Sequence, residues 1–285
     1  MILIADSGST KTSWCITEAG NVLQTIHTSG INPYFQSKDE IADQLTRELF
    51  PQLEVEKKDI RAVYFYGAGC VYDKVETVQG AIENLMNVPV IEVYTDLLAA
   101  ARGVCGRQPG IACILGTGSN SCFYDGETIV QNVSPLGYIL GDEGGGAVLG
   151  KLLVGDLLKG MMSDELKNKF LQQYELTPAQ IIDRVYRQPF PNRFLAGLSP
   201  FLAENIHEPM IYSLVLNSFK SFIIRNVKQY DYCAWPVHFT GSIAYYYRDI
   251  LADAASETGI RTGIVVKSPL QGLVAFHASI PPNKP

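Results

Sequence analysis

The fold of this chain is constrained most strongly by a pattern of short apolar strands and small-residue turns that occurs twice. Residues 1–5 read as a buried strand followed by a turn at 8–10, and residues 111–115 read as a strand followed by a turn at 118–120. Two more short strands, joined by a glycine turn, follow each opening. The openings lie roughly 110 residues apart, which indicates a weak internal repeat. The sequence therefore predicts two related halves that face one cleft.

The elements after the first opening place the chain in the α/β class. Strands at 62–66 and 90–94 alternate with helical patterns at 39–53, 71–86 and 97–104. Alternation of this kind predicts a parallel sheet covered by helices.

A turn cluster at 107–110 (Arg-Gln-Pro-Gly) interrupts this alternation and predicts a domain boundary. We expect an N-terminal lobe at 1–109 and a C-terminal lobe at 110–285, with a final helix at 273–285 that can pack back on the N-terminal lobe. The C-terminal lobe is expected to be mostly helical, with helices at 147–158, 165–174, 178–186, 210–227 and 242–256 and strands at 237–240 and 263–266.

Composition excludes several classes of function. The net charge is −6 and no run of basic residues occurs, so a nucleic-acid partner is disfavoured. No apolar stretch is long enough to span a membrane, and no cleavable leader is evident, so we expect a cytoplasmic protein. The six cysteines lie mostly in apolar segments without a C-x-x-C pair, which favours buried reduced thiols over metal ligands.

The first turn, residues 6–12 (Asp-Ser-Gly-Ser-Thr-Lys-Thr), has the composition of a phosphate-binding segment. Small side chains let the backbone approach an anion, and the amides with the hydroxyls of Ser9 and Thr10 can bind phosphate oxygens. Asp6, at the strand end, can hold a hydrated cation. A strand follows this turn, so no helix dipole is available, and a plain hairpin turn is the alternative.

A second turn of the same composition, residues 116–121 (Gly-Thr-Gly-Ser-Asn-Ser), follows the strand at 111–115. Two such turns favour a nucleotide held by donors from both halves. Asp96 lies between them in sequence, directly after an apolar strand and before an alanine-rich helix. It stands where ligands bind in open α/β sheets, although it could instead cap the helix, with Thr95 adjacent to it.

Two further glycine motifs stand at expected helix starts. Residues 141–146 (Gly-Asp-Glu-Gly-Gly-Gly) carry two carboxylates, one of which could be an N-cap. Consecutive glycines weaken a helix, which indicates close approach of a ligand or of another backbone. Residues 239–242 (Phe-Thr-Gly-Ser) occupy a strand-to-helix junction where Gly241 would let a flat ring lie against the backbone.

Taken in order, DSGSTKT, TD before the alanine-rich helix, LGTGSNS, GYILGDEGGG and FTGSIA resemble the superfamily of ATP-binding folds shared by sugar kinases, actin and heat-shock chaperones. The chain is most similar to the BadF/BadG/BcrA/BcrD ATPase group and, within it, to the N-acetylglucosamine kinases. This resemblance implies a two-lobed actin-like ATPase (ribonuclease H-like) fold with duplicated domains around a nucleotide cleft. It assigns sugar and phosphate binding to the N-terminal lobe and nucleotide binding to the C-terminal lobe.

The resemblance also implies roles for individual residues, with ATP and Mg²⁺ as cofactors. It makes Asp96 the catalytic base, and Asp6 the residue that holds Mg²⁺ through water. The residues implied to bind ATP are Asp6, Gly8, Ser9, Thr10, Lys11, Thr117, Gly118, Gly197, Gly241 and Ser242. Those implied to bind the sugar are Asn32, Asp96, Ser119, Asn120, Gly137, Tyr138 and Asp142.

The expected reaction is therefore phosphorylation of an amino sugar, N-acetylglucosamine, to its 6-phosphate. Leu136 stands where amino-sugar kinases often carry an aromatic residue, so another sugar such as N-acetylmuramic acid or glucosamine remains an alternative. A BadF-type ATPase that regulates or activates a partner protein is the alternative from another class. Activators that hold an iron–sulfur cluster are disfavoured, because residues 141–151 contain no cysteine. Association as a homodimer is compatible with this assignment.

Overall fold

The computed structural model describes residues 1–8 and 10–279, which form two compact units. Ser9 and the end of the predicted last helix, 280–285, lie outside the described residues. The first unit contains residues 1–109, the short segment Tyr124–Ile129 and the chain from Ser268 onward. The second unit contains Gly110–Phe123 and Val130–Lys267.

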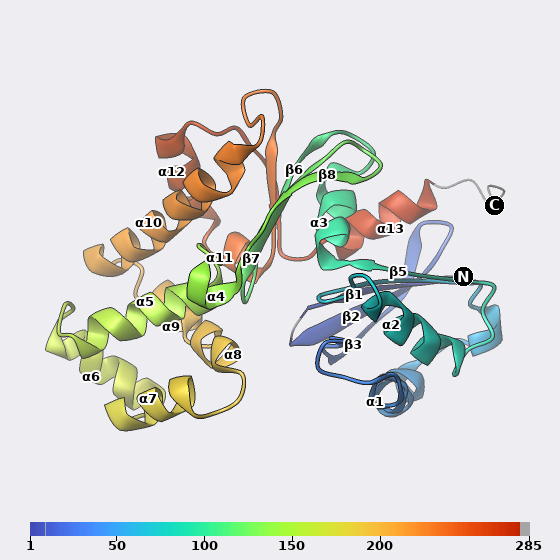
Figure 1. Ribbon diagram of the computed structural model, residues 1–285, viewed down its shortest axis with the longest axis horizontal. Helices are drawn as coiled ribbons and strands as arrows, with labels where there is room; N and C mark the ends of the chain where they lie inside the picture. Colours follow the sequence, from blue (N-terminus) through green and yellow to red (C-terminus); the bar gives the residue numbers. More distant parts are fainter. Residues whose placement is uncertain (9, 280–285) are drawn as a thin grey trace. The chain divides into compact units, whose positions relative to one another are not determined.

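The sheet of the first unit has five strands in the order β3-β2-β1-β4-β5 (Figure 1). The first three strands form an antiparallel meander, while β4 pairs parallel with β1 and β5 pairs parallel with β4. The strands are β1 (Ile2–Ser7), β2 (Lys11–Glu18), β3 (Asn21–Ser29), β4 (Ala62–Gly67) and β5 (Val90–Thr95).

Both faces of this sheet are covered, which explains why β1 is an unbroken apolar run. Leu3 and Ala5 belong to a core with α1 (Lys38–Gln44) and α2 (Lys74–Glu83). Ile4, which points the other way, packs in a second cluster with α3 (Asp96–Cys105) and α13 (Leu270–Ala278). Figure 1 shows the two helix pairs on opposite sides of the sheet.

Two helices of this unit are shorter than the sequence predicts. The predicted helix at 39–53 is α-helical only to Gln44 and then continues as a π-helical turn, Leu45–Leu49, and a 3₁₀ turn, Phe50–Gln52. Pro51 has no amide hydrogen to donate, which prevents a regular α-helical end. The helix predicted at 71–86 begins only at Lys74, because Tyr72 takes a left-handed conformation with φ of 49°. A separate 3₁₀ turn occupies Lys57–Asp59.

The second sheet repeats the topology of the first. Its order is β10-β9-β6-β7-β8, in which three consecutive strands are again followed by two strands that pair parallel on the far side of the first. The internal repeat expected from sequence is thus confirmed at the level of strand order. The strands are β6 (Gly110–Leu115), β7 (Ser119–Tyr124), β8 (Ile129–Val133), β9 (Val237–Thr240) and β10 (Thr262–Val266).

Helices make up most of the second unit and enclose its large apolar core. They are α4 (Gly137–Leu140), α5 (Gly146–Leu158), α6 (Asp164–Gln173), α7 (Pro178–Tyr186), α8 (Pro191–Ala196), α9 (Ser199–Glu204), α10 (Pro209–Arg225), α11 (Ser242–Tyr246) and α12 (Arg248–Thr258), with a 3₁₀ turn at Val227–Gln229. No helix in the described part of the chain is long and apolar enough to cross a membrane.

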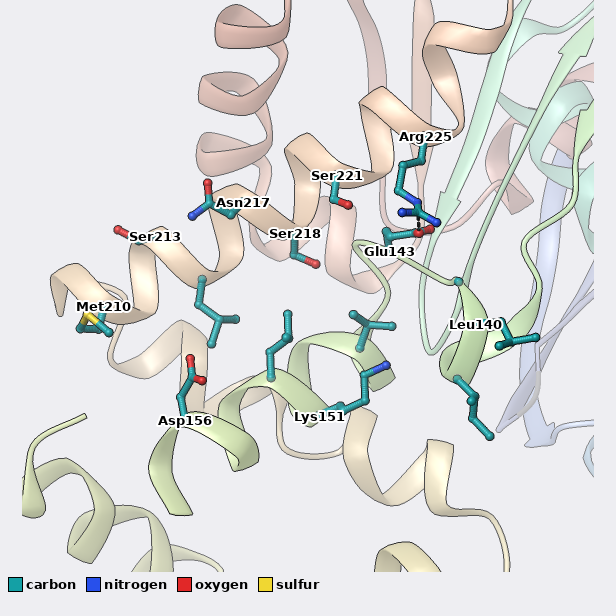
Figure 2. A pocket seen from close by; sticks show the side chains of 15 residues that line it. Leu140, Glu143, Lys151, Asp156, Met210, Ser213, Asn217, Ser218, Ser221 and Arg225 are labelled. Atoms are coloured by element: carbon teal, nitrogen blue, oxygen red, sulfur yellow. Dashed lines mark ion pairs between the residues drawn. The ribbon is translucent and has the colours of Figure 1, made fainter. Parts of the chain in front are cut away.

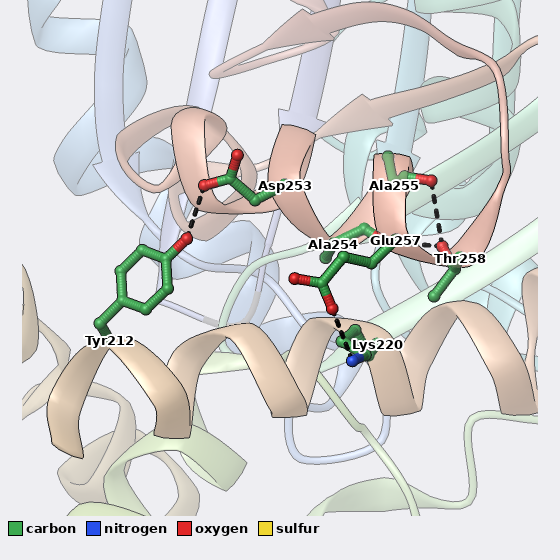
Figure 3. A network of polar contacts seen from close by, with 7 residues as sticks. All are labelled: Tyr212, Lys220, Asp253, Ala254, Ala255, Glu257 and Thr258. Carbon is green, nitrogen blue, oxygen red and sulfur yellow. Dashed lines mark hydrogen bonds and ion pairs between the residues drawn. The ribbon is translucent and has the colours of Figure 1, made fainter. Parts of the chain in front are cut away.

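Polar contacts fix α10 against α12 beside their apolar interface (Figure 3). Tyr212 donates a hydrogen bond to Asp253 at 2.7 Å, and Lys220 forms an ion pair with Glu257 at 2.7 Å. The single helix predicted at 242–256 is instead two helices separated at Tyr247. Tyr247 itself has φ of −108° and ψ of 24°, although its amide still donates to the carbonyl of Ile243, and its buried phenol donates to the carbonyl of Ser199.

The packing of α13 on α3 generates a first prediction. A Cβ atom added to Gly272 would collide with the carbonyl oxygen of Gly103. We expect Gly272→Ala to cost about 2 kcal/mol, because neither backbone can move without disturbing the core. Thermal unfolding should record this as a fall in Tm of about 4–8 °C.

Gly155→Ala is the matched control, since Gly155 lies inside α5 and a Cβ there meets no atom within 4 Å. That change should leave Tm unchanged or raise it, because alanine favours helix by about 0.5–1 kcal/mol over glycine. Equal effects of the two substitutions would contradict the close approach of α3 and α13.

Candidate active site

Two carboxylates of the first unit lie at the carboxyl edge of its parallel strands. The ends of β1, β4 and β5 are in register, with Ser7 opposite Gly67 and Gly67 opposite Thr95. Asp6 is the penultimate residue of β1, and Asp96 directly follows β5. This edge is where open α/β sheets bind their ligands. The structure therefore brings together two residues predicted to take part in the chemistry.

Asp96 is not the cap of its helix, so that alternative from the sequence is wrong. Thr95 is the N-cap of α3, and its hydroxyl accepts the amide of Leu98 at 3.2 Å. Asp96 is the first helical residue and remains partly exposed. Burial raises the pKa of its carboxyl to about 6, against the lowering effect of hydrogen bonds from the amides of Leu97 and Asp96 itself. Asp96 is thus not the N-cap of α3, and the pKa of its carboxyl lies well above that of an exposed aspartate.

Asp6 has a similar environment. Burial raises its pKa to about 6; a hydrogen bond from Ser268 lowers it, and the negative charge of Asp96 raises it further. No cluster of three His, Cys, Asp or Glu side chains that could hold a metal exists among residues 1–8 and 10–279. A single partly exposed carboxylate nevertheless fits Mg²⁺ well, since this ion keeps most of its waters and usually takes its other ligands from phosphates.

The turn after β1 is closed by its own backbone. The amide of Gly8 donates to the carbonyl of Lys11 at 3.0 Å, while Thr10 and Lys11 are exposed. The amide of Gly30 donates to the carbonyl of Thr10 at 3.1 Å. These contacts connect the predicted phosphate turn to the segment that leads into Asn32.

Sequence reasoning missed the residue that makes this connection. The hydroxyl of Ser7 is fully buried, lies 2.7 Å from that of Thr12, donates to the carbonyl of Ile31 at 3.1 Å and accepts the amide of Ile31 at 3.0 Å. Asn32 follows at once, and its Oδ1 accepts the amide of Tyr34 at 3.0 Å. In the sequence, the feature that could have indicated this role is a serine at the end of a strand whose preceding residues are mostly apolar.

In the second unit, the turn between β6 and β7 lies against the glycine-rich segment before α5. The amides of Gly146 and Ala147 donate to the carbonyls of Gly116 and Thr117, each at 2.8 Å. The N-cap of α5 is Gly145, so neither Asp142 nor Glu143 caps this helix, contrary to one expectation. A Cβ atom on Gly145 would lie 2.7 Å from the carbonyl carbon of Gly118. The consecutive glycines thus permit the approach of another backbone.

Asp142 is held at this turn in a left-handed conformation with φ of 54°. Its Oδ1 accepts the amide of Ser119 at 3.2 Å, and a Cβ on Gly118 would lie 2.6 Å from its Oδ2. Burial raises the pKa of this carboxyl. The structure therefore places Thr117, Gly118, Ser119 and Asp142 in one group.

Gly241 approaches the same turn from another strand. With φ of 117° it precedes Ser242, the first residue of α11, and a Cβ there would collide with the carbonyl of Leu115. Gly197 ends α8, and the methyl of the preceding residue, Ala196, would lie 3.2 Å from a Cβ on Gly146. The predicted adenosine turn and the α8 end thus adjoin the turn of β6 and β7.

Asn120, Gly137 and Tyr138 take other positions in this unit. Asn120 accepts the amide of Ser121 at 2.9 Å and the side-chain amide of Asn132 at 3.0 Å. Gly137 and Tyr138 begin α4, and the loop folds back so that the amide of Asp142 donates to the carbonyl of Pro135 at 2.9 Å. The amide of Gly141 donates to the carbonyl of Gly137 at 2.7 Å, which connects Gly137 to the residue that precedes Asp142.

A groove of about 570 Å³, which the sequence did not indicate, opens beside α4 between α5 and α10 (Figure 2). Glu143 turns into it and pairs with Arg225 at 2.5 Å. The adjacent Asp142 turns toward Ser119 instead. The neighbouring carboxylates of Asp142 and Glu143 thus lie in different environments. Only Asp142 is among the residues predicted to bind the sugar.

Comparison with known proteins places this geometry in context. No protein-family profile and no curated protein sequence matches the chain. Among solved structures, a candidate N-acetylglucosamine kinase from Porphyromonas gingivalis is 53% identical, with a TM-score of 0.96 over 98% of this chain and 99% of that one.

More distant structures share the fold. A candidate N-acetylglucosamine kinase from Chromobacterium violaceum is 20% identical, with a TM-score of 0.74 over 97% of this chain and 99% of that one. A ROK-family glucokinase from Streptomyces griseus, solved with glucose and AMPPNP, is 16% identical, with a TM-score of 0.59 over 96% of this chain and 97% of that one. The fold is therefore the two-domain α/β fold of sugar kinases and actin-like ATPases.

The roles of Thr95 and Asp96 can be separated by stability alone. Thr95→Ala should lower the free energy of unfolding by about 1 kcal/mol through loss of the cap, while Thr95→Ser should not. Asp96→Asn should leave it unchanged or raise it, because a carboxyl whose pKa is raised by burial destabilises the fold when it is ionised at neutral pH. Thermal unfolding at neutral pH measures all three, and a large loss in Asp96→Asn would restore a structural role for Asp96.

Proposed function

The chain belongs to the N-acetylglucosamine kinase-like group of the BadF/BadG/BcrA/BcrD ATPase family, and from this premise we propose that it transfers the γ-phosphoryl group of ATP to the primary hydroxyl of N-acetylglucosamine. The observation that carries the proposal is the carboxylate of Asp96. It stands at the ligand-binding edge of the sheet, partly exposed, with its helix capped by another residue. Such a carboxylate is available to accept a proton from a substrate.

Asp96 acts in this reaction as the general base. A sugar hydroxyl is a weak nucleophile until its proton is removed, and a carboxylate within hydrogen-bond distance accepts that proton as the oxygen attacks phosphorus. A pKa raised to about 6 makes Asp96 a stronger base than an exposed aspartate, while leaving it mostly ionised at neutral pH. The two properties together suit proton transfer under cellular conditions.

Asp6 holds the hydrated Mg²⁺ that accompanies ATP. When bound, this complex supplies the transferable phosphoryl group and neutralises its charge. The exposed residues Thr10 and Lys11 of the turn after β1 contact the phosphates in this proposal, and Gly8, whose amide donates to the carbonyl of Lys11, allows the close approach. In the second unit the residues proposed to contact the nucleotide are Thr117, Gly118, Gly197, Gly241 and Ser242. They belong to the turn after β6, the end of α8 and the start of α11.

The sugar is recognised by donors and acceptors that different residues supply. Asn32 has its Oδ1 engaged by Tyr34, so its side-chain amide nitrogen is the group that it offers. Ser119, Asn120, Gly137, Tyr138 and Asp142 complete the proposed set. Asp142, fixed by the amide of Ser119, can accept hydrogen bonds from hydroxyls. Because ATP is available in the cytoplasm, we place the reaction there.

Release of ADP, measured with a panel of sugars, tests the substrate. We expect turnover with N-acetylglucosamine and little ADP without sugar. Preference for N-acetylmuramic acid or glucosamine would keep the kinase activity and change the substrate. ADP release that does not depend on any sugar would overturn the proposal and favour an ATPase that regulates a partner protein.

Asp96→Asn should reduce kcat by about 10²-fold or more, because asparagine keeps the shape of the side chain and cannot accept the proton. Affinity for ATP, measured by calorimetry without sugar, should remain within about 2-fold, since the base does not hold the nucleotide. Asp156→Asn is a matched control, because Asp156 lies on α5 at the groove in Figure 2 and has no role in the proposed reaction. Near-normal turnover in Asp96→Asn would disprove the assignment.

The pH dependence of kcat/KM should show the raised carboxyl pKa values, because this ratio reports the ionisation of the free enzyme. Because burial raises the pKa of both Asp96 and Asp6 to about 6, protonation below that value removes the base and the cation-binding charge. We expect kcat/KM to fall as the pH decreases through about 6, by about tenfold or more per unit below it. A decline that begins only near pH about 4, the range of exposed aspartate, would contradict this environment.

A further inference from the structure

Ser268 is the first residue of the third chain segment that belongs to the first unit. Lys267 ends the second unit, and Ser268 begins the segment that leads into α13. Its hydroxyl donates to Oδ2 of Asp6 at 3.0 Å and accepts the amide of Leu270 at 3.2 Å. Within the described residues, Ser268 is the only hydrogen-bond partner of the Asp6 side chain.

The packing of α13 fixes the position of Ser268. Gly272 lies against the carbonyl of Gly103 in α3, at a separation that admits no side chain. Farther along α13, the buried ring of His277 lies with Nε2 2.8 Å from the hydroxyl of Tyr66. Tyr66 is the register partner of Asp6 in the adjacent strand. The helix is therefore anchored to the strands that carry the candidate site.

This geometry has a direct effect on the Asp6 carboxylate. A carboxylate with one oxygen held by a rigid donor cannot rotate freely about its last side-chain bond. Its other oxygen is then presented in one direction, where a hydrated cation can be bound without loss of further side-chain freedom. Ser268 is suited to this because the Leu270 amide orients its hydroxyl.

We propose that Ser268 is a positioning residue for Asp6, and that its hydroxyl orients the carboxylate toward the hydrated Mg²⁺ of the nucleotide complex. The inference rests on the proposed function, in which Asp6 holds that ion. Ser268 itself contacts neither nucleotide nor sugar in this proposal. Its effect is therefore expected on the binding of Mg²⁺ and ADP together and on kcat, and not on the KM for the sugar.

Four single variants of the full chain test the role of Ser268. Ser268→Ala should weaken binding of ADP in the presence of Mg²⁺, measured by calorimetry, by about 10-fold and lower kcat by a similar factor. The KM for N-acetylglucosamine should stay within about 2-fold. Ser268→Thr keeps the hydroxyl and should restore both quantities. Asp6→Asn should impair the binding at least as strongly.

Ser163→Ala supplies the matched control for loss of a helix-terminal hydroxyl. Ser163 accepts the amide of Leu166 at 3.2 Å, the same distance as between Ser268 and the amide of Leu270, and lies in the second unit, away from Asp6 in the first. It should leave both the binding of ADP with Mg²⁺ and kcat unchanged. Thermal unfolding of every variant establishes that differences in binding do not arise from unfolding.

The double variant Asp6→Asn with Ser268→Ala separates the possible failures. If Ser268 acts through Asp6, Ser268→Ala should have no further effect on binding in the Asp6→Asn background. If the effects of the two substitutions on binding add fully, or if Ser268→Ala alone binds normally, the inference is wrong and the proposed role of Asp6 is unaffected. Normal binding in Asp6→Asn would instead show that the proposed role of Asp6 is wrong.

Discussion

Close approach of one backbone to another determines where the candidate site residues stand. At Gly103 and Gly272, at Gly145 and the Gly118 carbonyl, and at Gly241 and the Leu115 carbonyl, the separation leaves no room for a side chain. The first of these fixes α13, which brings Ser268 to Asp6; the others assemble the turn of the second unit. Since protein interiors are close-packed, these contacts are rigid constraints, and the polar groups depend on them for position.

Much of the fold could be predicted because its central strands β1, β4 and β6 are short and buried on both faces. Such strands appear in sequence as apolar runs that end in small polar residues, and the repeated opening predicted two related halves, whose sheets share one strand order. Asp96 could be singled out for the same reason, since the end of an apolar strand marks the binding edge of the sheet. Only the structure shows that Thr95, and not Asp96, caps the helix, because the amide of Leu98 donates to the hydroxyl of Thr95.

Other features depend on contacts that local patterns do not contain. Ser268 and Asp6 are 262 residues apart, and nothing near either residue indicates the hydrogen bond between them. The break at Tyr247 and the late start of α2 after Tyr72 lie in the backbone conformations of single residues, which the apolar pattern does not contain. The sequence predicts that the glycines before α5 allow either a ligand or another backbone to approach closely. Only the structure shows that the backbone of Gly118 is what approaches them.

The way the chain is shared between the two units has a consequence for its assembly during synthesis. The first unit takes residues 1–109, but also 124–129 and the chain from Ser268 onward. Its segment from Ser268 leaves the ribosome only after the second unit, so the apolar face of the first sheet around Ile4 and Tyr66 is covered by α3 alone until then. A nascent chain that has completed its first 109 residues therefore still lacks α13, and a cut after Pro109 would separate this helix from the sheet that it covers.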